Sequence, residues 1–186
     1  MTLLNKHLIH RNVTFRDADD ALKSMATAMV ENQYVKPTFV DAVIRREHKF
    51  PTGLPTGGIM VAIPHADWTN VNRGTISVAT LEKPVLFKNM GNPEEDLAVR
   101  LIFMLAVSEP HAEVNLLRDL MGIVQNQATL QGLLDAPTDL DLFKRLEDMF
   151  QDIVVDKEKK RRPQNEKDYR CVWLRNCNFN CCAECA

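Results

Sequence analysis

The segment VRLIFMLAV at residues 99–107, which contains the longest apolar run of the chain (residues 101–107), constrains the fold more than any other feature. It is far too short to cross a bilayer, and it is apolar at nearly every position, which is typical of a central strand covered on both faces. A second apolar run, residues 59–63, lies between a glycine pair and Pro64. An apolar run of this length, bounded by glycine and proline, predicts another buried strand.

Segments with helical periodicity lie before, between and after these strands. The predicted helices span residues 17–32, 38–47, 110–126, 129–134 and 138–150. Thr38 is the expected N-cap of the second helix. We expect two further strands, residues 75–81 and 85–87, to pair across the short turn between them. Helices that alternate with strands predict an α/β fold, in which a mixed sheet of about five strands is flanked by helices.

Composition divides the chain into a domain, residues 1–150, and a tail, residues 151–186. Most of the first half of the tail is the charged segment DKEKKRRPQNEKDYR at residues 156–170, which cannot bury enough surface to fold alone, so we expect the tail to be disordered. The net charge of −2 gives no general attraction to nucleic acid or to an anionic membrane. The N-terminus lacks the apolar core of a signal peptide, so we expect a cytoplasmic protein that does not insert into the membrane.

Metal and cofactor signals are weak. The domain contains no Walker loop, dinucleotide-binding glycine pattern or HExxH motif, so we expect no cofactor and no metal ion there. All five cysteines lie in the tail: Cys171, Cys177, Cys181, Cys182 and Cys185. Four thiolates would suffice for Zn²⁺, but their spacing differs from that of a standard zinc ribbon. A tail without function, such as a frame-shifted remnant of a further domain, is the other interpretation.

His65 is the main candidate for chemistry. It follows the buried strand 59–63 and Pro64, so its imidazole lies where a strand leaves the core, at the edge where open α/β folds place their ligands. Pro64 fixes its own φ and restricts Ile63, which gives the imidazole a stiff support. A neutral imidazole nitrogen is a good nucleophile. The alternative is a histidine that merely hydrogen-bonds a loop.

Two other side chains suit an anionic group. His111 is expected in the first turn of helix 110–126, where the helix dipole and free N–H groups favour a phosphoryl group. Arg46 lies just before the turn FPTG, and a guanidinium neutralises phosphate oxygens through two parallel donors. A simple surface position explains either residue equally well. The remaining histidines have no supporting context and are expected on the surface: His7, His10 and His48.

Together, these motifs resemble enzyme IIA of the fructose–mannitol class of the sugar phosphotransferase system. The resemblance is carried by Arg46-Glu47-(x)3-Pro51-Thr52-Gly53, by VAIPH at residues 61–65, and by an apolar strand with His111 shortly after it. FPTGL and VAIPHAD are most similar to the galactitol-type branch. The resemblance covers about residues 1–150 and leaves out only the tail.

The resemblance implies a phosphohistidine mechanism. His65 would take a phosphoryl group from the phosphorylated histidine phosphocarrier protein and pass it to a cysteine of an enzyme IIB partner. By motif position, Arg46 matches the family's active-site arginine and His111 its second active-site histidine. The partner surface is expected to surround His65 and to include Trp68 and Met60, since large apolar side chains often dominate interfaces.

Two considerations bear on the particular role. Mannitol-type members have a glutamate six residues before the active histidine, and this chain has Ile59 there, which weakens a mannitol assignment. Nitrogen-type enzyme IIA relatives share the fold and the active histidine but regulate other proteins through their phosphorylation state. The FPTGLP segment and the galactitol-like flanks favour sugar transport over this regulatory alternative.

Overall fold

A mixed sheet of five strands is the framework of the domain. The computed structural model describes residues 4–108 and 110–161, with side chains described for residues 4–108, 116–118 and 120–150. The strands are β1 (Leu4–Val13), β2 (Gly53–Leu54), β3 (Met60–Ala62), β4 (Thr75–Lys88) and β5 (Asp96–Ala106). They lie in the order β1-β4-β5-β3-β2, with β1–β4 and β3–β5 parallel and the other two pairs antiparallel. The predicted mixed sheet of about five strands is confirmed.

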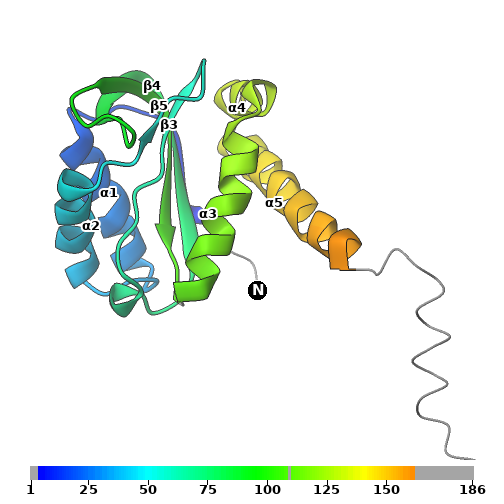
Figure 1. Ribbon diagram of the computed structural model, residues 1–186, viewed down its shortest axis with the longest axis horizontal. Coiled ribbons are helices and arrows are strands. Elements are labelled where there is room, and N and C mark those ends of the chain that lie inside the picture. The colour runs from blue at the N-terminus through cyan, green and yellow to red at the C-terminus, as the bar shows by residue number, and fades with distance from the viewer. Residues whose placement is uncertain (1–3, 109, 162–186) are drawn as a thin grey trace, which may run out of the picture. The chain divides into compact units, whose positions relative to one another are not determined.

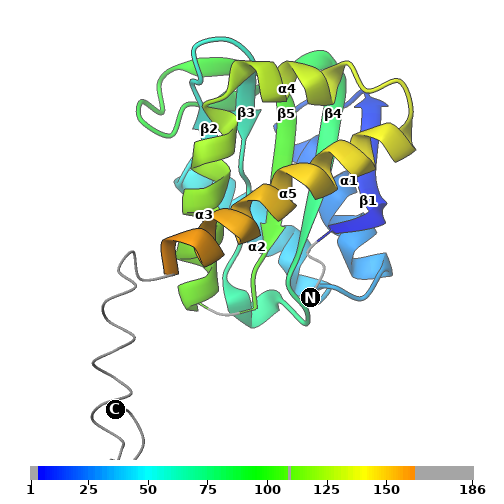
Figure 2. The ribbon, with the colours of Figure 1, turned by 90° about the vertical axis from the view of Figure 1, so that its right-hand side faces the viewer.

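Helices cover both faces of the sheet (Figures 1 and 2). The helices are α1 (Ala18–Glu31), α2 (Thr38–Lys49), α3 (Pro110–Val124), α4 (Gln127–Leu134) and α5 (Asp139–Arg161), with a short 3-10 helix, η1 (Trp68–Asn70). Figure 1 shows α1 and α2 on one side of the sheet and α3, α4 and the start of α5 on the other. No helix in the described part of the chain is long and apolar enough to cross a membrane.

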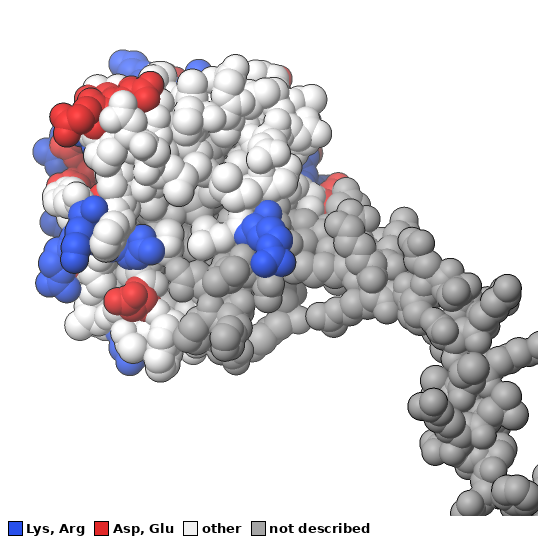
Figure 3. All heavy atoms as spheres, in the orientation of Figure 1, with Lys and Arg blue, Asp and Glu red and all other residues white. Residues whose placement is uncertain are grey.

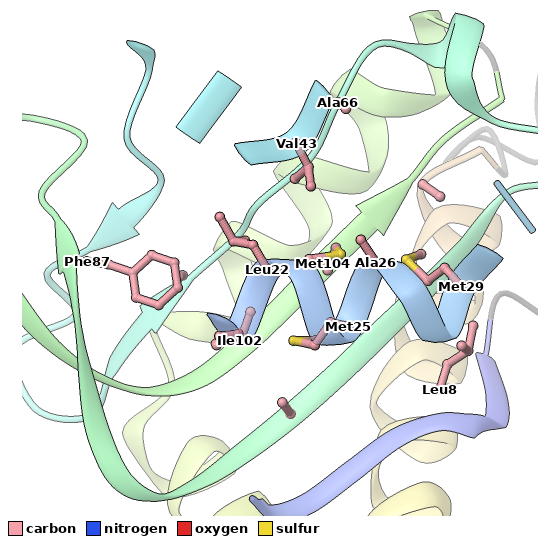
Figure 4. Packing of buried hydrophobic residues seen from close by; sticks show 14 of the residues in the cluster. Leu8, Leu22, Met25, Ala26, Met29, Val43, Ala66, Phe87, Ile102 and Met104 are labelled. Atoms are coloured by element: carbon pink, nitrogen blue, oxygen red, sulfur yellow. The ribbon is translucent and has the colours of Figure 1, made fainter. Parts of the chain in front are cut away.

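The core forms where α1 and α2 pack on the sheet. Figure 4 shows Leu22, Met25 and Met29 of α1 close to Ile102 and Met104 of β5, all of them members of one buried cluster. Residues 101–106 of β5 are fully buried. The prediction of a central strand covered on both faces is therefore confirmed.

The predicted hairpin at residues 75–87 is wrong, because β4 is one continuous strand. Both halves pair with β5: Thr80 lies opposite Leu101 and Val85 opposite Val99. Val85 is five residues after Thr80 in β4, whereas their partners in β5 are only two residues apart, so the extra residues of β4 form a bulge. Pro84 has no N–H to donate, and a bulge is one of the few places where a strand accommodates proline. The sequence alone made this bulge look like a turn.

Two strands were not predicted. β1 has only a partly alternating burial pattern, and polar residues such as Lys6 and His7 occupy its exposed positions. It forms because it supplies a parallel partner to the edge of β4. β2 is two residues long and lies within the segment that looked like a simple turn, where it pairs with β3.

Two helix ends differ from expectation. The Thr38 N-cap is wrong: Pro37 occupies the cap position without a side-chain hydrogen bond, and the Thr38 hydroxyl donates to Asn70 Oδ1 at 2.8 Å. α5 continues to Arg161 instead of ending near Phe150, since lysine, glutamate and arginine all favour helix. The chain groups into units of residues 1–149 and 150–186. The predicted disorder beyond residue 161 lies outside the described residues.

Candidate functional site

His65 lies at the exit of β3, between two buried residues. The backbone carbonyl of Pro64 accepts the N–H of Leu105 in β5 at 2.9 Å, and His65 itself forms a parallel bridge with Leu105. Ala66 is buried in the same core cluster as Val43 of α2 (Figure 4). His65 is half-buried. The sheet and the core therefore hold the backbone on both sides of this histidine, while part of its side chain faces solvent.

One ring nitrogen of His65 is tied to its own backbone. Nδ1 lies 2.9 Å from the carbonyl oxygen of Ile63. A carbonyl only accepts hydrogen bonds, so Nδ1 carries the proton, and the lone pair of the neutral ring is on Nε2. This bond fixes both the tautomer and the ring orientation. The arrangement suits Nε2 for nucleophilic attack.

The last turn of α2 is joined to the same strand exit. The carboxylate of Glu47 accepts the N–H of Thr52 at 2.8 Å and its hydroxyl at 2.7 Å. The carbonyl of Thr52 in turn accepts the N–H of Ile63 at 3.3 Å. Burial raises the pKa of Glu47, and the two bonds from Thr52 act in the opposite direction. Arg46 is half-buried and directly precedes this carboxylate. Sequence reasoning gave no role to Glu47 or Thr52, although both belong to the motif.

Cations gather at this end of α2. Figure 3 shows Lys and Arg side chains over α2 at the left of the view. The exposed ring of Phe50 lies 6.0 Å from Arg46 Cζ and 5.1 Å from Lys49 Nζ, both within reach of cation–π attraction. Positive charge gathered on one part of a surface attracts incoming anionic groups. Trp68, three residues after His65, is also exposed, whereas Met60 is half-buried against the core.

The other histidines differ in their surroundings. The backbone of His111 lies in the first turn of α3, as predicted, and its side chain is outside the described ones. His7 and His48 are exposed, and His48 Nε2 lies 2.8 Å from Asp19. The surface prediction for His10 is wrong: its Nε2 is buried without a hydrogen-bond partner among the described residues, and burial lowers its pKa.

Metal ligands do not cluster in the described part of the chain, where no three His, Cys, Asp or Glu side chains could hold an ion. The five tail cysteines lie outside the described residues. The backbone N–H of Ile59 donates to Gln127 Oε1 of α4 at 2.8 Å, and Gln127 Nε2 donates to the carbonyl oxygen of Thr56 at 2.8 Å. Two hydrogen bonds with Gln127 therefore hold the loop between β2 and β3 against α4.

The family of this domain is shown by its sequence. Residues 2–149 match the family described as "Phosphoenolpyruvate-dependent sugar phosphotransferase system, EIIA 2", and the chain is a member of that family. It is 28% identical over 129 residues to the "PTS system galactitol-specific EIIA component" of Escherichia coli (strain K12), which covers 69% of this chain and 85% of that protein. The resemblance seen in the motifs is confirmed.

Solved structures share the fold. The complex of enzyme IIA and phosphorylated enzyme IIB of the Escherichia coli mannitol system contains a chain with a TM-score of 0.65 and 20% identity, over 78% of this chain and 99% of that one. The nitrogen regulatory protein IIA-Ntr from Neisseria meningitidis gives a TM-score of 0.58 at 18% identity, over 77% and 96%. At identities of 20% or less, these similarities show a shared fold and nothing more.

Proposed function

We propose that this protein is a phosphocarrier for sugar uptake that accepts a phosphoryl group on His65 Nε2. The donor is the phosphorylated histidine phosphocarrier protein, and the acceptor is a cysteine of an enzyme IIB partner in the cytoplasm. The observation that carries the proposal is the bond from His65 Nδ1 to Ile63, which directs the lone pair to Nε2 on a half-exposed ring.

The first transfer forms a bond between His65 Nε2 and phosphorus while the bond between the donor's histidine nitrogen and phosphorus breaks. In the second transfer, a cysteine sulfur of enzyme IIB takes the phosphoryl group and Nε2 regains its lone pair. Arg46 and His111 steady the equatorial oxygens, so that catalysis consists of positioning and charge stabilisation. Neither step requires a metal ion or a cofactor.

The galactitol-specific relative supports transport of galactitol or a related sugar, because its identity extends over most of both chains. The mannitol complex supports an enzyme IIB as the acceptor, since a domain of the same fold binds one there. The nitrogen-regulatory alternative has support from the shared fold. Transport has the additional support of sequence identity.

Labelling with phosphoenolpyruvate, enzyme I and the phosphocarrier protein tests the proposal. We expect wild type to gain one acid-labile phosphoryl group, detected by intact mass, and His65→Ala to gain none. His7→Ala removes an exposed histidine of β1 and should label like wild type. The assignment is wrong if His65→Ala labels as strongly as wild type.

A further inference from the structure

Glu47 carries the one charge that is buried among the described side chains, and phosphoryl transfer as proposed gives it no part. Burying a charge is unfavourable unless its oxygens are paired, and both oxygens here bind Thr52. An apolar side chain at this helix position would bury surface without that cost. The carboxylate instead fixes the position of the last turn of α2 relative to Thr52, because each of its two hydrogen bonds has a preferred geometry.

These bonds link α2 to the phosphate-accepting histidine through a short series of contacts. Glu47 holds Thr52, the carbonyl of Thr52 accepts the N–H of Ile63, and the carbonyl of Ile63 accepts His65 Nδ1–H. The series begins one residue after Arg46. The backbone from which the Arg46 side chain projects is thus held by the same contacts that orient the imidazole.

We propose that Glu47 is a positioning residue for phosphoryl transfer, which fixes the last turn of α2 so that the Arg46 guanidinium meets the phosphoryl oxygens at His65. This inference rests on the proposed function of His65. Arginine has a long, flexible side chain, so the location of its backbone decides which oxygens it reaches. Small displacements of a charge-stabilising group are costly, since a misplacement of about 1 Å can lower a rate about 100-fold.

Glu47→Gln tests the inference with little change in side-chain volume. The amide oxygen can still accept the N–H of Thr52, but the amide NH₂ replaces the oxygen that accepted the Thr52 hydroxyl. That hydroxyl must then turn round and accept, and both bonds lose the strength that the carboxylate charge gave them. We expect kcat/KM for transfer from the phosphocarrier protein to fall between about 10-fold and 100-fold. Asp41→Asn removes an exposed carboxylate from the same helix and should leave the transfer rate unchanged.

A double-mutant cycle with Arg46→Ala separates positioning from a purely structural role. If Glu47 acts through Arg46, Glu47→Gln has less than about a twofold effect in the Arg46→Ala background, because there is no guanidinium left to misplace. An equal fold-loss in both backgrounds would overturn the inference. Urea unfolding of each variant ensures that the rates are compared on folded protein.

Thr52 provides a second route that does not alter the charge. Thr52→Val is nearly isosteric but removes the hydroxyl that binds Glu47 Oε2, whereas Thr52→Ser retains it. The valine variant should show a reduced transfer rate, and the serine variant should recover most of it. Equal rates in the two variants contradict the inference even if Glu47→Gln fails to fold.

The two proposals fail in different ways. Labelling of a residue other than His65 removes the proposed function and this inference together. Labelling of His65 in wild type, combined with an unchanged transfer rate in folded Glu47→Gln, removes the inference alone.

Discussion

Gly53 in β2 permits a backbone contact that no other residue allows. A Cβ atom at this position would lie 2.5 Å from the carbonyl oxygen of Lys88, 3.2 Å from its carbon and 3.4 Å from Leu97 Cδ1. Two of these atoms belong to the backbone of β4, which is held in the sheet. The carbonyl of Gly53 also accepts the N–H of Met90 at 2.9 Å. Gly53→Ala therefore forces β2 away from β4 and weakens this bond.

The size of the effect follows from these contacts. Overpacking a tight site costs about 1–3 kcal/mol, and a weakened backbone hydrogen bond adds about 1 kcal/mol. The lower entropy of the unfolded alanine chain offsets about 0.4–1 kcal/mol. We expect Gly53→Ala to lower the free energy of unfolding by about 1–3.5 kcal/mol, which for a chain of this size lowers Tm by about 2–4 °C per kcal/mol.

Gly122→Ala is the matched control. Gly122 is an exposed residue within α3, and a Cβ there would meet no atom within 4 Å. The same substitution should raise the stability of the folded protein by about 0.5–1 kcal/mol, because alanine favours helix over glycine.

Urea unfolding followed by circular dichroism measures both variants, and equal m-values would show that only stability has changed. The steric reasoning is refuted if Gly53→Ala unfolds at the same or a higher urea concentration than wild type.

Two further predictions concern His10 and the start of α1. Burial lowers the pKa of His10 in the folded protein below the ordinary histidine value of 6.5. Between these two pKa values the unfolded chain binds more protons than the folded protein, so the free energy of unfolding should decrease as the pH falls from 6.5 towards the folded pKa. In His10→Gln, the free energy of unfolding measured with urea should depend less on pH in this window. The same pH dependence in the variant and in wild type would contradict the lowered pKa of His10. Asp17→Ala removes the carboxylate that accepts the N–H of Asp20 at 2.8 Å, which should cost about 1 kcal/mol of unfolding free energy, whereas Asp17→Ser should retain most of it. Equal thermal stability of these two Asp17 variants would show that this cap contributes little.

The last turn of α2 shows how the candidate site divides between sequence and structure. The motif predicted Arg46 and His65 as parts of one site, and the family that the motif indicated is the one that the chain matches. The motif gave no indication that Glu47 and Thr52 connect the end of α2 with the strand exit at His65. That connection depends on Ile63, which directly follows β3 and lies eleven residues further along the chain than Thr52.

Local signals determined much of the fold in advance. The helical period of residues 17–32 predicted α1, and the nearly continuous apolar segment at residues 99–107 predicted the central strand β5. His65 could be placed at a strand exit because Pro64 ends the apolar run before it. Each of these signals lies within a single segment, so no knowledge of its neighbours was needed.

Tertiary structure decided what depends on pairing between distant segments. β1 is a strand because the edge of β4 offers it hydrogen bonds, and residues 81–84 form a bulge because both flanking segments pair with β5. His10 looked like a surface residue until the fold buried its Nε2. Backbone hydrogen bonds between strands and the loss of solvent on packing are set by residues far away in the chain, and a local pattern does not contain them.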